Sequence, residues 1–165
     1  MSDLKIKKFP NSILRKKAEK VGEVTDSVKK ILADMANAMY LSQGVGLAAV
    51  QVGIGKQLAV IDTGNGLIKM INPAITKREG TEAQEEGCLS CPGACVKVRR
   101  AKKVVVSFMN ENGDVMQLKA EGLLARAIQH ELDHLSGKLI IDYMNPIKKM
   151  LIRRKIPKTT LGREQ

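Results

Sequence analysis

The segment His130-Glu131-Leu132-Asp133-His134 constrains this chain more than any other part of the sequence, and it contains the only two histidines. Residues four apart lie on one face of an α-helix, so two imidazoles with this spacing can bind one metal ion. Glu131 stands beside the first histidine, where a carboxylate can exchange a proton with water at the ion. The pattern therefore predicts a helix that carries a hydrolytic metal site.

The residues around this segment predict that the helix is buried. We expect it to span residues 121–136, with Gly137 as the residue that follows its C-terminal cap. Apolar residues recur at helical spacing on the N-terminal side of the first histidine. They are Leu123, Leu124, Ala127 and Ile128. This apolar face disfavours the alternative in which the two histidines are merely exposed polar residues.

Two histidines need a third protein ligand, because catalytic zinc-type sites use three and leave one position open. Metzincins place a third histidine where this chain has Ile140, and thermolysin-like enzymes use a downstream glutamate. Asp142 lies only eight residues beyond His134, and the next acidic residue is Glu164. The remaining soft ligands are upstream: Cys88, Cys91 and Cys95.

The cysteine segment, read alone, leaves two other interpretations open. Cys88 and Cys91 form a CxxC pair, which is typical of a thioredoxin-like redox site or of half a structural zinc site. Pro92-Gly93 is a poor start for the helix that a redox pair normally opens. Three cysteines are an odd number, which disfavours a disulfide framework. A structural zinc site with cysteine and histidine ligands stays possible on ligand count.

Residues 44–51, GVGLAAVQ, form a third segment of small residues that ends in Gln51. Small residues let a backbone approach a ligand closely. The GxG resembles part of a dinucleotide fingerprint, but the third glycine is absent and a helix rather than a strand precedes it. We therefore expect no nucleotide cofactor. A tight turn followed by a packed segment is equally consistent with these residues.

Strands and helices come in runs rather than in alternation, which predicts an α+β fold with antiparallel sheets. We expect small sheets packed around a central helix that carries HExxH, with an N-terminal helix and a basic C-terminal helix. The N-terminal helix spans residues 26–41 with Thr25 or Asp26 as cap, and the last helix starts with Asn145 as cap and Pro146 in its first turn. Strands are predicted at residues 58–61, 70–75, 102–109 and 115–119, the last two joined by a hairpin turn at residues 111–114.

The charge is unevenly distributed in this chain of 165 residues with a net charge of +11. Residues 145–165 contain seven basic residues and one acid, which indicates either a solvated helical end or a docking element for RNA. Aromatic residues make up 2% of the chain, too few for a base-stacking platform. No apolar run approaches the roughly 20 residues that cross a bilayer, and the first residues lack the features of a targeting peptide, so we expect a cytoplasmic protein without membrane contact.

Together, GVGLAAVQ (44–51), EGCLS (86–90) and QHELDH (129–134) resemble the three ordered motifs of the peptide deformylase family. The first matches the family pattern GxGxAAxQ at every fixed position, and the similarity extends from about Leu4 to Lys149. Val50 departs from the family, which often has proline there, and Cys91 stands where an aliphatic residue is more usual. The ordered set is far more specific than any one motif.

The resemblance implies a role for each matched residue. The metal ligands would be Cys88, His130 and His134. Glu131 would carry the proton, while the side-chain amide of Gln51 and the backbone N–H of Leu89 would stabilise the oxyanion. Glu86 would hold the cysteine loop in place.

The resemblance also implies substrate contacts. Val45 and Gly46 would lie beside an extended peptide, and Arg100 would lie near the mouth of the site. Leu123 and Ile128 could line an aliphatic pocket for methionine, although they are equally consistent with core residues.

The implied reaction removes the N-formyl group from the formylmethionine of nascent proteins and releases formate. It would use one divalent metal ion per chain, Fe(II) in the family, with zinc, nickel or cobalt as substitutes. The partners would be N-formylmethionyl peptides and, through the basic tail, the ribosome. Residues 1–147 would form the catalytic domain and residues 148–165 the basic tail. The alternatives are another HExxH metallopeptidase and a non-enzymatic module that binds structural zinc or RNA.

Overall fold

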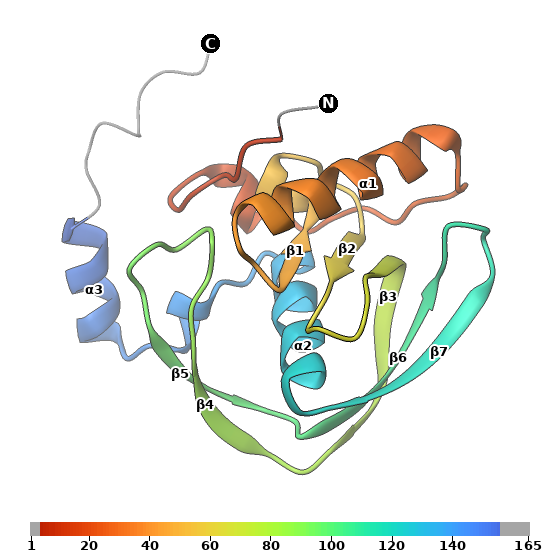
Figure 1. Ribbon diagram of the computed structural model, residues 1–165. Helices are drawn as coiled ribbons and strands as arrows, with labels where there is room; N and C mark the ends of the chain where they lie inside the picture. Colours follow the sequence, from red (N-terminus) through yellow and green to blue (C-terminus); the bar gives the residue numbers. More distant parts are fainter. Residues whose placement is uncertain (1–3, 156–165) are drawn as a thin grey trace.

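The computed structural model describes residues 4–155, which form an α+β fold with two antiparallel sheets (Figure 1). Its helices are α1 (Asp26–Leu41), α2 (Gly122–Leu135) and α3 (Pro146–Lys155). Its strands are β1 (Gly46–Ala48), β2 (Leu58–Ile61), β3 (Ile68–Glu79), β4 (Glu82–Glu86), β5 (Val96–Arg100), β6 (Lys103–Met109) and β7 (Val115–Glu121). Short 3-10 turns are η1 (Ser12–Arg15), η2 (Ala49–Val52) and η3 (Ile140–Tyr143). The predicted α+β class is confirmed.

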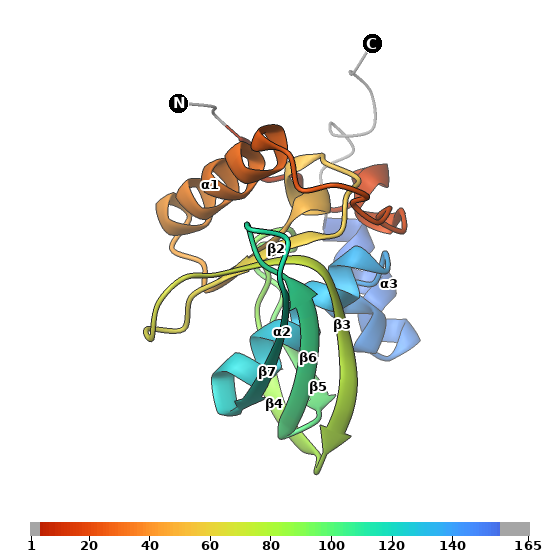
Figure 2. The ribbon, with the colours of Figure 1, turned by 90° about the vertical axis from the view of Figure 1, so that its right-hand side faces the viewer.

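The larger sheet has the strand order β1-β2-β3-β6-β7, and all its pairs are antiparallel. The strands β6 and β7 form the predicted hairpin, in which Met109 lies opposite Val115. Asn110 fixes the turn, because its Oδ1 accepts hydrogen bonds from the N–H groups of Asn112 and Asp114 at 2.9 and 3.0 Å. Figure 2 shows β3, β6 and β7 side by side.

The strands β4 and β5 form a separate two-stranded sheet that continues the β3–β6 pair around a corner. The sequence patterns miss both strands. In β4 (EAQEE) every residue is polar except Ala83, and in β5 (VKVRR) the alternation is carried by only two valines. Such short ribbons contain charged residues that strand propensities disfavour, so cross-strand pairing rather than local preference defines them.

Helix α1 has the predicted bounds and lies against β1 and β2. Its cap is Thr25, whose side chain accepts a hydrogen bond from the Val28 N–H at 3.3 Å. Its apolar face is buried. Helix α1 therefore covers the larger sheet at its β1–β2 edge.

Helix α2 lies at the centre of the molecule, between the two sheets in Figure 1, and contacts β1, β2, β6 and β7. Eight of its residues are buried, Ile128 completely. Gly137 has a φ of 79° in the left-handed region, as expected for a residue after the C-terminal cap. A Cβ there would lie 2.6 Å from the carbonyl oxygen of Arg15, so glycine also permits close packing.

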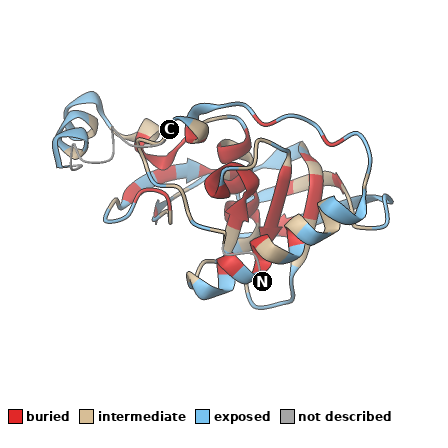
Figure 3. Cartoon of the chain, turned by 90° about the horizontal axis from the view of Figure 1, so that it is seen from above, coloured by how far each residue is buried: buried red, intermediate tan, exposed pale blue. Residues whose placement is uncertain are grey.

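Helix α3 stands at the edge of the molecule, where exposed colours dominate in Figure 3. The Asn145 side chain accepts a hydrogen bond from the Lys148 N–H at 2.9 Å, which confirms the predicted cap. None of its residues is buried. The last ten residues of the predicted basic tail lie outside the described part of the chain. No described helix has the length and apolar character needed to cross a membrane.

Candidate active site

The side chains of Cys88, His130 and His134 converge, and their ligand atoms all lie within 4.8 Å of one another. The Cys88 Sγ lies 3.3 Å from the His134 Nε2, which lies 3.1 Å from the His130 Nε2. Helix α2 places the two imidazoles four residues apart on one face. The cysteine comes from a tight turn after β4, in which the Cys91 N–H donates to the Cys88 carbonyl at 3.1 Å. One thiolate and two imidazoles form a ligand set suited to zinc or iron.

The electrostatics of this cluster favour a cysteine thiolate. The Cys91 thiol donates a hydrogen bond to Cys88, and together with the two histidines it lowers the pKa of Cys88 to about 2 despite burial. The same bond raises the pKa of Cys91, which therefore keeps its proton. Burial lowers the pKa of His130, but Cys88 and Glu86 outweigh it and raise that pKa to about 10. The cluster therefore stabilises positive charge beside the Cys88 thiolate.

Glu86, at the end of β4, orients the first histidine. Its Oε2 lies 3.0 Å from the His130 Nδ1, and its two oxygens also accept hydrogen bonds from Arg100 at 2.9 Å each. Arg126 donates to the Oε1 of Glu86 at 2.8 Å. Burial raises the pKa of Glu86, but these three partners outweigh it and lower the pKa to about 2. The carboxylate therefore stays ionised and fixes the His130 ring with its Nε2 toward Cys88.

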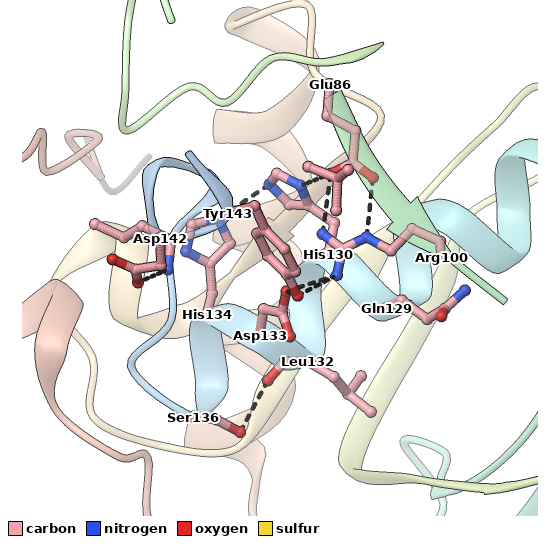
Figure 4. Close-up of polar contacts among 12 residues, drawn as sticks. Glu86, Arg100, Gln129, His130, Leu132, Asp133, His134, Ser136, Asp142 and Tyr143 are labelled. Atoms are coloured by element: carbon pink, nitrogen blue, oxygen red, sulfur yellow. Dashed lines mark hydrogen bonds and ion pairs between the residues drawn. The ribbon is translucent and has the colours of Figure 1, made fainter. Parts of the chain in front are cut away.

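Arg100 extends this network behind the histidine, as Figure 4 shows. Its guanidinium donates to the Oδ2 of Asp133 at 2.6 Å and contacts the hydroxyl of Tyr143 at 3.0 Å. The Tyr143 hydroxyl donates to the same Asp133 oxygen at 2.6 Å. Only 5% of Arg100 is exposed, so its charge is balanced inside the protein. The network links α2, β5 and η3.

Glu131 is buried against β1. Its Oε2 is a buried atom without a hydrogen-bond partner in the described part of the chain. Burial raises its pKa above the usual range, although His130 and His134 oppose this. A Cβ at Gly46 would collide with the Oε1 of Glu131, so only glycine leaves room for the carboxylate. This close approach of Glu131 is the physical reason for a glycine at position 46 of the GVGLAAVQ motif.

Gln51 reaches the cluster from η2. Its Oε1 accepts a hydrogen bond from the Ala48 N–H at 2.9 Å, which turns its Nε2 toward Ser90 Oγ at 3.2 Å and Cys88 Sγ at 3.8 Å. Within residues 4–155, no hydrogen bond occupies the backbone N–H of Leu89. A side-chain N–H and a backbone N–H therefore flank the cysteine.

A cavity of about 540 Å³ opens beside these groups. Of the sequence-predicted residues it is lined by Val45, Gly46, Gln51, Glu86, Cys88, Leu89, Leu123, His130 and Glu131. The structure does not bring Arg100 or Ile128 to this cavity. Arg100 lies behind Glu86, and Ile128 is fully buried in the core with residues of β6 and β7.

Four residues of the site escape sequence analysis. Arg126 is four residues before His130, so helical spacing could have placed it on the same face. Asp133 lies inside the HExxH segment at a position that the pattern leaves open. Ser90 lies inside the EGCLS motif but has no assigned role there, and Tyr143 carries no local signal, because only the folded chain brings them to Gln51 and Arg100.

Comparison with known proteins agrees with this geometry. The family model of polypeptide deformylase matches residues 3–150. A peptide deformylase from Thermodesulfovibrio yellowstonii is 46% identical over 94% of this chain and 97% of its own length, and one from Pseudoalteromonas translucida is 47% identical over 96% of both chains.

Solved structures give the same result. The crystal structure of a peptide deformylase from Legionella pneumophila has a TM-score of 0.88 at 42% identity and covers 95% of both chains. The enzyme from Ehrlichia chaffeensis in complex with actinonin has a TM-score of 0.92 at 35% identity and covers 96% of this chain and 98% of its own. The chain therefore belongs to the peptide deformylase family, the hydrolases that remove the N-formyl group from nascent peptides.

Proposed function

We propose that Cys88, His130 and His134 hold one divalent metal ion at which this chain deformylates N-formylmethionyl peptides. The observation that carries the proposal is the convergence of these three ligand atoms within 4.8 Å beside a buried carboxylate oxygen without a partner. The ligand set fits a metal chemically, because a low-pKa cysteine supplies a thiolate and Glu86 turns the Nε2 of His130 toward it. When bound, the ion supplies Lewis acidity and lowers the pKa of water near it.

Glu131 is the proton carrier in this proposal. Its Oε2 accepts a proton from the attacking water and later delivers it to the nitrogen that leaves the formyl carbon. Burial raises the pKa of the carboxyl, which makes it a better proton acceptor than an exposed glutamate. Gly46 leaves the space in which the carboxylate lies.

The Nε2 of Gln51 and the backbone N–H of Leu89 stabilise the negative charge that develops on the formyl oxygen. Support comes from their positions on either side of Cys88 and from the hydrogen bond that fixes the Gln51 amide to Ala48. One donor of this kind contributes about 3 kcal/mol to transition-state stabilisation.

The substrate binds as an extended strand along β1. This strand is at the edge of its sheet, so in the described structure one side of its backbone faces no other strand. An extended peptide can add to such an edge by main-chain hydrogen bonds. Val45 and Gly46 line the cavity at this edge, and the half-exposed Leu123 offers an aliphatic contact for methionine.

We propose Fe(II) as the resident ion, because it is the ion that the resemblance to the family implies. Zinc, nickel and cobalt can substitute, since a thiolate with two imidazoles accepts all four metals. Anaerobic purification followed by elemental analysis tests this assignment. Since formylated chains emerge from cytoplasmic ribosomes, we also propose a cytoplasmic location.

The decisive experiment measures formate release from formyl-Met-Ala-Ser by the metal-loaded protein and by Glu131→Gln, with acetyl-Met-Ala-Ser as control substrate. We expect the variant to retain its metal and to lose at least about 100-fold in kcat. Cleavage of the acetyl peptide, or full activity in the variant, would refute the assignment of Glu131 and favour another amide hydrolase.

A second role, ribosome docking through residues 148–165, is supported by α3. This helix combines five basic residues with the exposed apolar residues Ile147, Met150 and Leu151. Phosphate contacts make such binding strongly dependent on salt. Truncation after Pro146 should abolish salt-dependent cosedimentation with ribosomes, whereas unchanged cosedimentation would exclude the tail as the contact.

A further inference from the structure

A second cavity, of about 680 Å³, opens on another face of α2. It is lined on α2 by Gln129, Leu132, Asp133 and Leu135 and, just after the helix, by Ser136, none of which lines the cavity beside Glu131. Its other walls come from β3 and the turn that follows it, from the end of β5, and from Lys17, Gln57 and Tyr143. The deformylation mechanism leaves this cavity unused. Its size falls in the range of small-molecule sites.

The charges around this cavity are mostly positive. Lys17, Arg78, Arg99 and Arg100 line it, against a single carboxylate, Asp133. Arg100 already forms an ion pair with that carboxylate, and the Tyr143 hydroxyl donates a hydrogen bond to it. In the described ranges, the side chains of Lys17, Arg78 and Arg99 form no ion pair, so three cations are available to a ligand.

The walls are held in place by hydrogen bonds. The Oε1 of Gln129 accepts from the Ala101 N–H at 2.9 Å, and its Nε2 donates to the Ala101 carbonyl at 3.0 Å. These bonds fix the chain after β5 against α2. The floor is apolar and includes Pro73, Ile75, Leu132 and Leu135. These cations line a hollow with an apolar floor, which a flat solvated basic surface does not offer.

We propose that this cavity is a binding site for a small organic polyanion with at least two phosphate or carboxylate groups. Arginine forms paired hydrogen bonds with either group, and Arg78 and Arg99 line the cavity from different strands, β3 and β5. Two anionic groups separated by a short carbon chain match two arginines on different strands. The apolar floor accommodates that chain.

The site shares Arg100 and Asp133 with the network that reaches His130 through Glu86. A bound anion therefore changes the electrostatic environment of the His130 ring. The zinc-loaded protein should show this as a shift of the His130 side-chain NMR resonances on titration. This readout does not depend on turnover, so it is separate from the test of the deformylase mechanism.

The experiment titrates the zinc-loaded protein with fructose 1,6-bisphosphate and with tricarballylate by calorimetry at low ionic strength. The two probes distinguish a phosphate ligand from a carboxylate ligand. We expect saturable binding of at least one probe, weakened about tenfold or more by Arg78→Gln and by Arg99→Gln. Both arginines are exposed, so these variants should keep their melting temperature and their formate release.

Lys77→Gln is the matched control. It removes the same charge from the neighbouring position of β3, whose side chain lines a different surface with Lys103 and Lys119. Equal weakening by all three variants, or no binding of either probe at about 10 mM, would overturn the proposal and leave a solvated basic surface. Tighter binding of a short RNA duplex than of both probes, with the same dependence on Arg78 and Arg99, would also overturn it, because the groove would then recognise a nucleic-acid backbone.

Discussion

Helices α2 and α3 lie close in sequence but differ in the burial of their charged side chains: α2 buries some of them, whereas α3 buries none. Arg126 of α2 is buried and lies in a closed network with Glu86. In α3 no residue is buried, and its anchoring ion pair joins Lys149 to Asp142 at the surface at 2.8 Å. A buried charge requires every partner, since an uncompensated one is costly, whereas solvent replaces a lost surface partner. The first helix can therefore hold a precise site, and the second stays available for an external contact.

Removal of a buried cation should give the largest effect. Arg100→Met leaves Asp133 without its ion pair and removes two hydrogen bonds from Glu86. Breaking a buried pair from one side costs about 3–5 kcal/mol of unfolding free energy. Urea denaturation of metal-loaded protein measures this cost. A loss below about 1 kcal/mol would mean that the buried network at Asp133 of α2 contributes no more to stability than the exposed charges of α3.

The second effect concerns metal affinity. Glu86→Gln keeps the shape of the side chain but removes the charge that orients His130. Loss of such a partner typically weakens metal binding about 10–100-fold. Competition with a chromophoric chelator gives the affinity. Glu85→Gln, at the exposed neighbouring position, is the control and should bind metal as the unmodified protein does. Equal affinities would mean that Glu86 does not support the ligand set.

A smaller and pH-dependent effect is expected at the base of α3. Burial raises the pKa of Asp142, but hydrogen bonds from Arg15, the Leu139 N–H and Lys149 outweigh it and hold the pKa below its usual range. Because the folded-state pKa is depressed, the stabilisation is complete above the unfolded value of about 3.9 and is lost as the pH falls below it. Asp142→Asn should therefore cost about 1 kcal/mol at pH 7 and measurably less near pH 2, because the carboxylate takes up a proton progressively as the pH falls toward its depressed folded-state pKa. A cost that does not change between these pH values would show that packing, not charge, matters here.

The smallest effect is expected for a single surface pair. Lys149→Met removes one partner of Asp142 but leaves Arg15 in place. The expected loss is about 0.5 kcal/mol in urea denaturation, and it should shrink in 1 M salt. Lys148→Met, which changes an exposed neighbour, provides the baseline. A loss comparable to that of Arg100→Met would contradict the idea that α3 is held weakly.

The same contrast explains what the sequence could predict. Periodicity sets the bounds of α1, and the caps at Thr25 and Asn145 follow from side chains that satisfy the first N–H groups of a helix. The convergence of Cys88 with the two histidines was predicted by resemblance to the family motifs. These features depend on local spacing or on ordered motifs.

The partners of Arg100 could not be predicted in this way. Asp133 and Tyr143 lie 33 and 43 residues from it in sequence, and neither has a local pattern that points to β5. Ile128 shows a second limit of sequence-based prediction. Its apolar side chain fits a substrate pocket as well as the core, and it lies in the core. Tertiary packing alone decides between these outcomes.

The contact between the two ends of the fold has a consequence for how the enzyme is made. The Ala18 N–H donates to the carbonyl of Leu135 at 2.9 Å, and the backbone of Arg15 packs against Gly137. These pairs join segments more than 100 residues apart, and such nonlocal closure slows folding. A copy still in synthesis also lacks His130 and His134 until most of the chain exists. Each new molecule therefore stays inactive until the segment with both histidines has been made and has packed against residues 15–18.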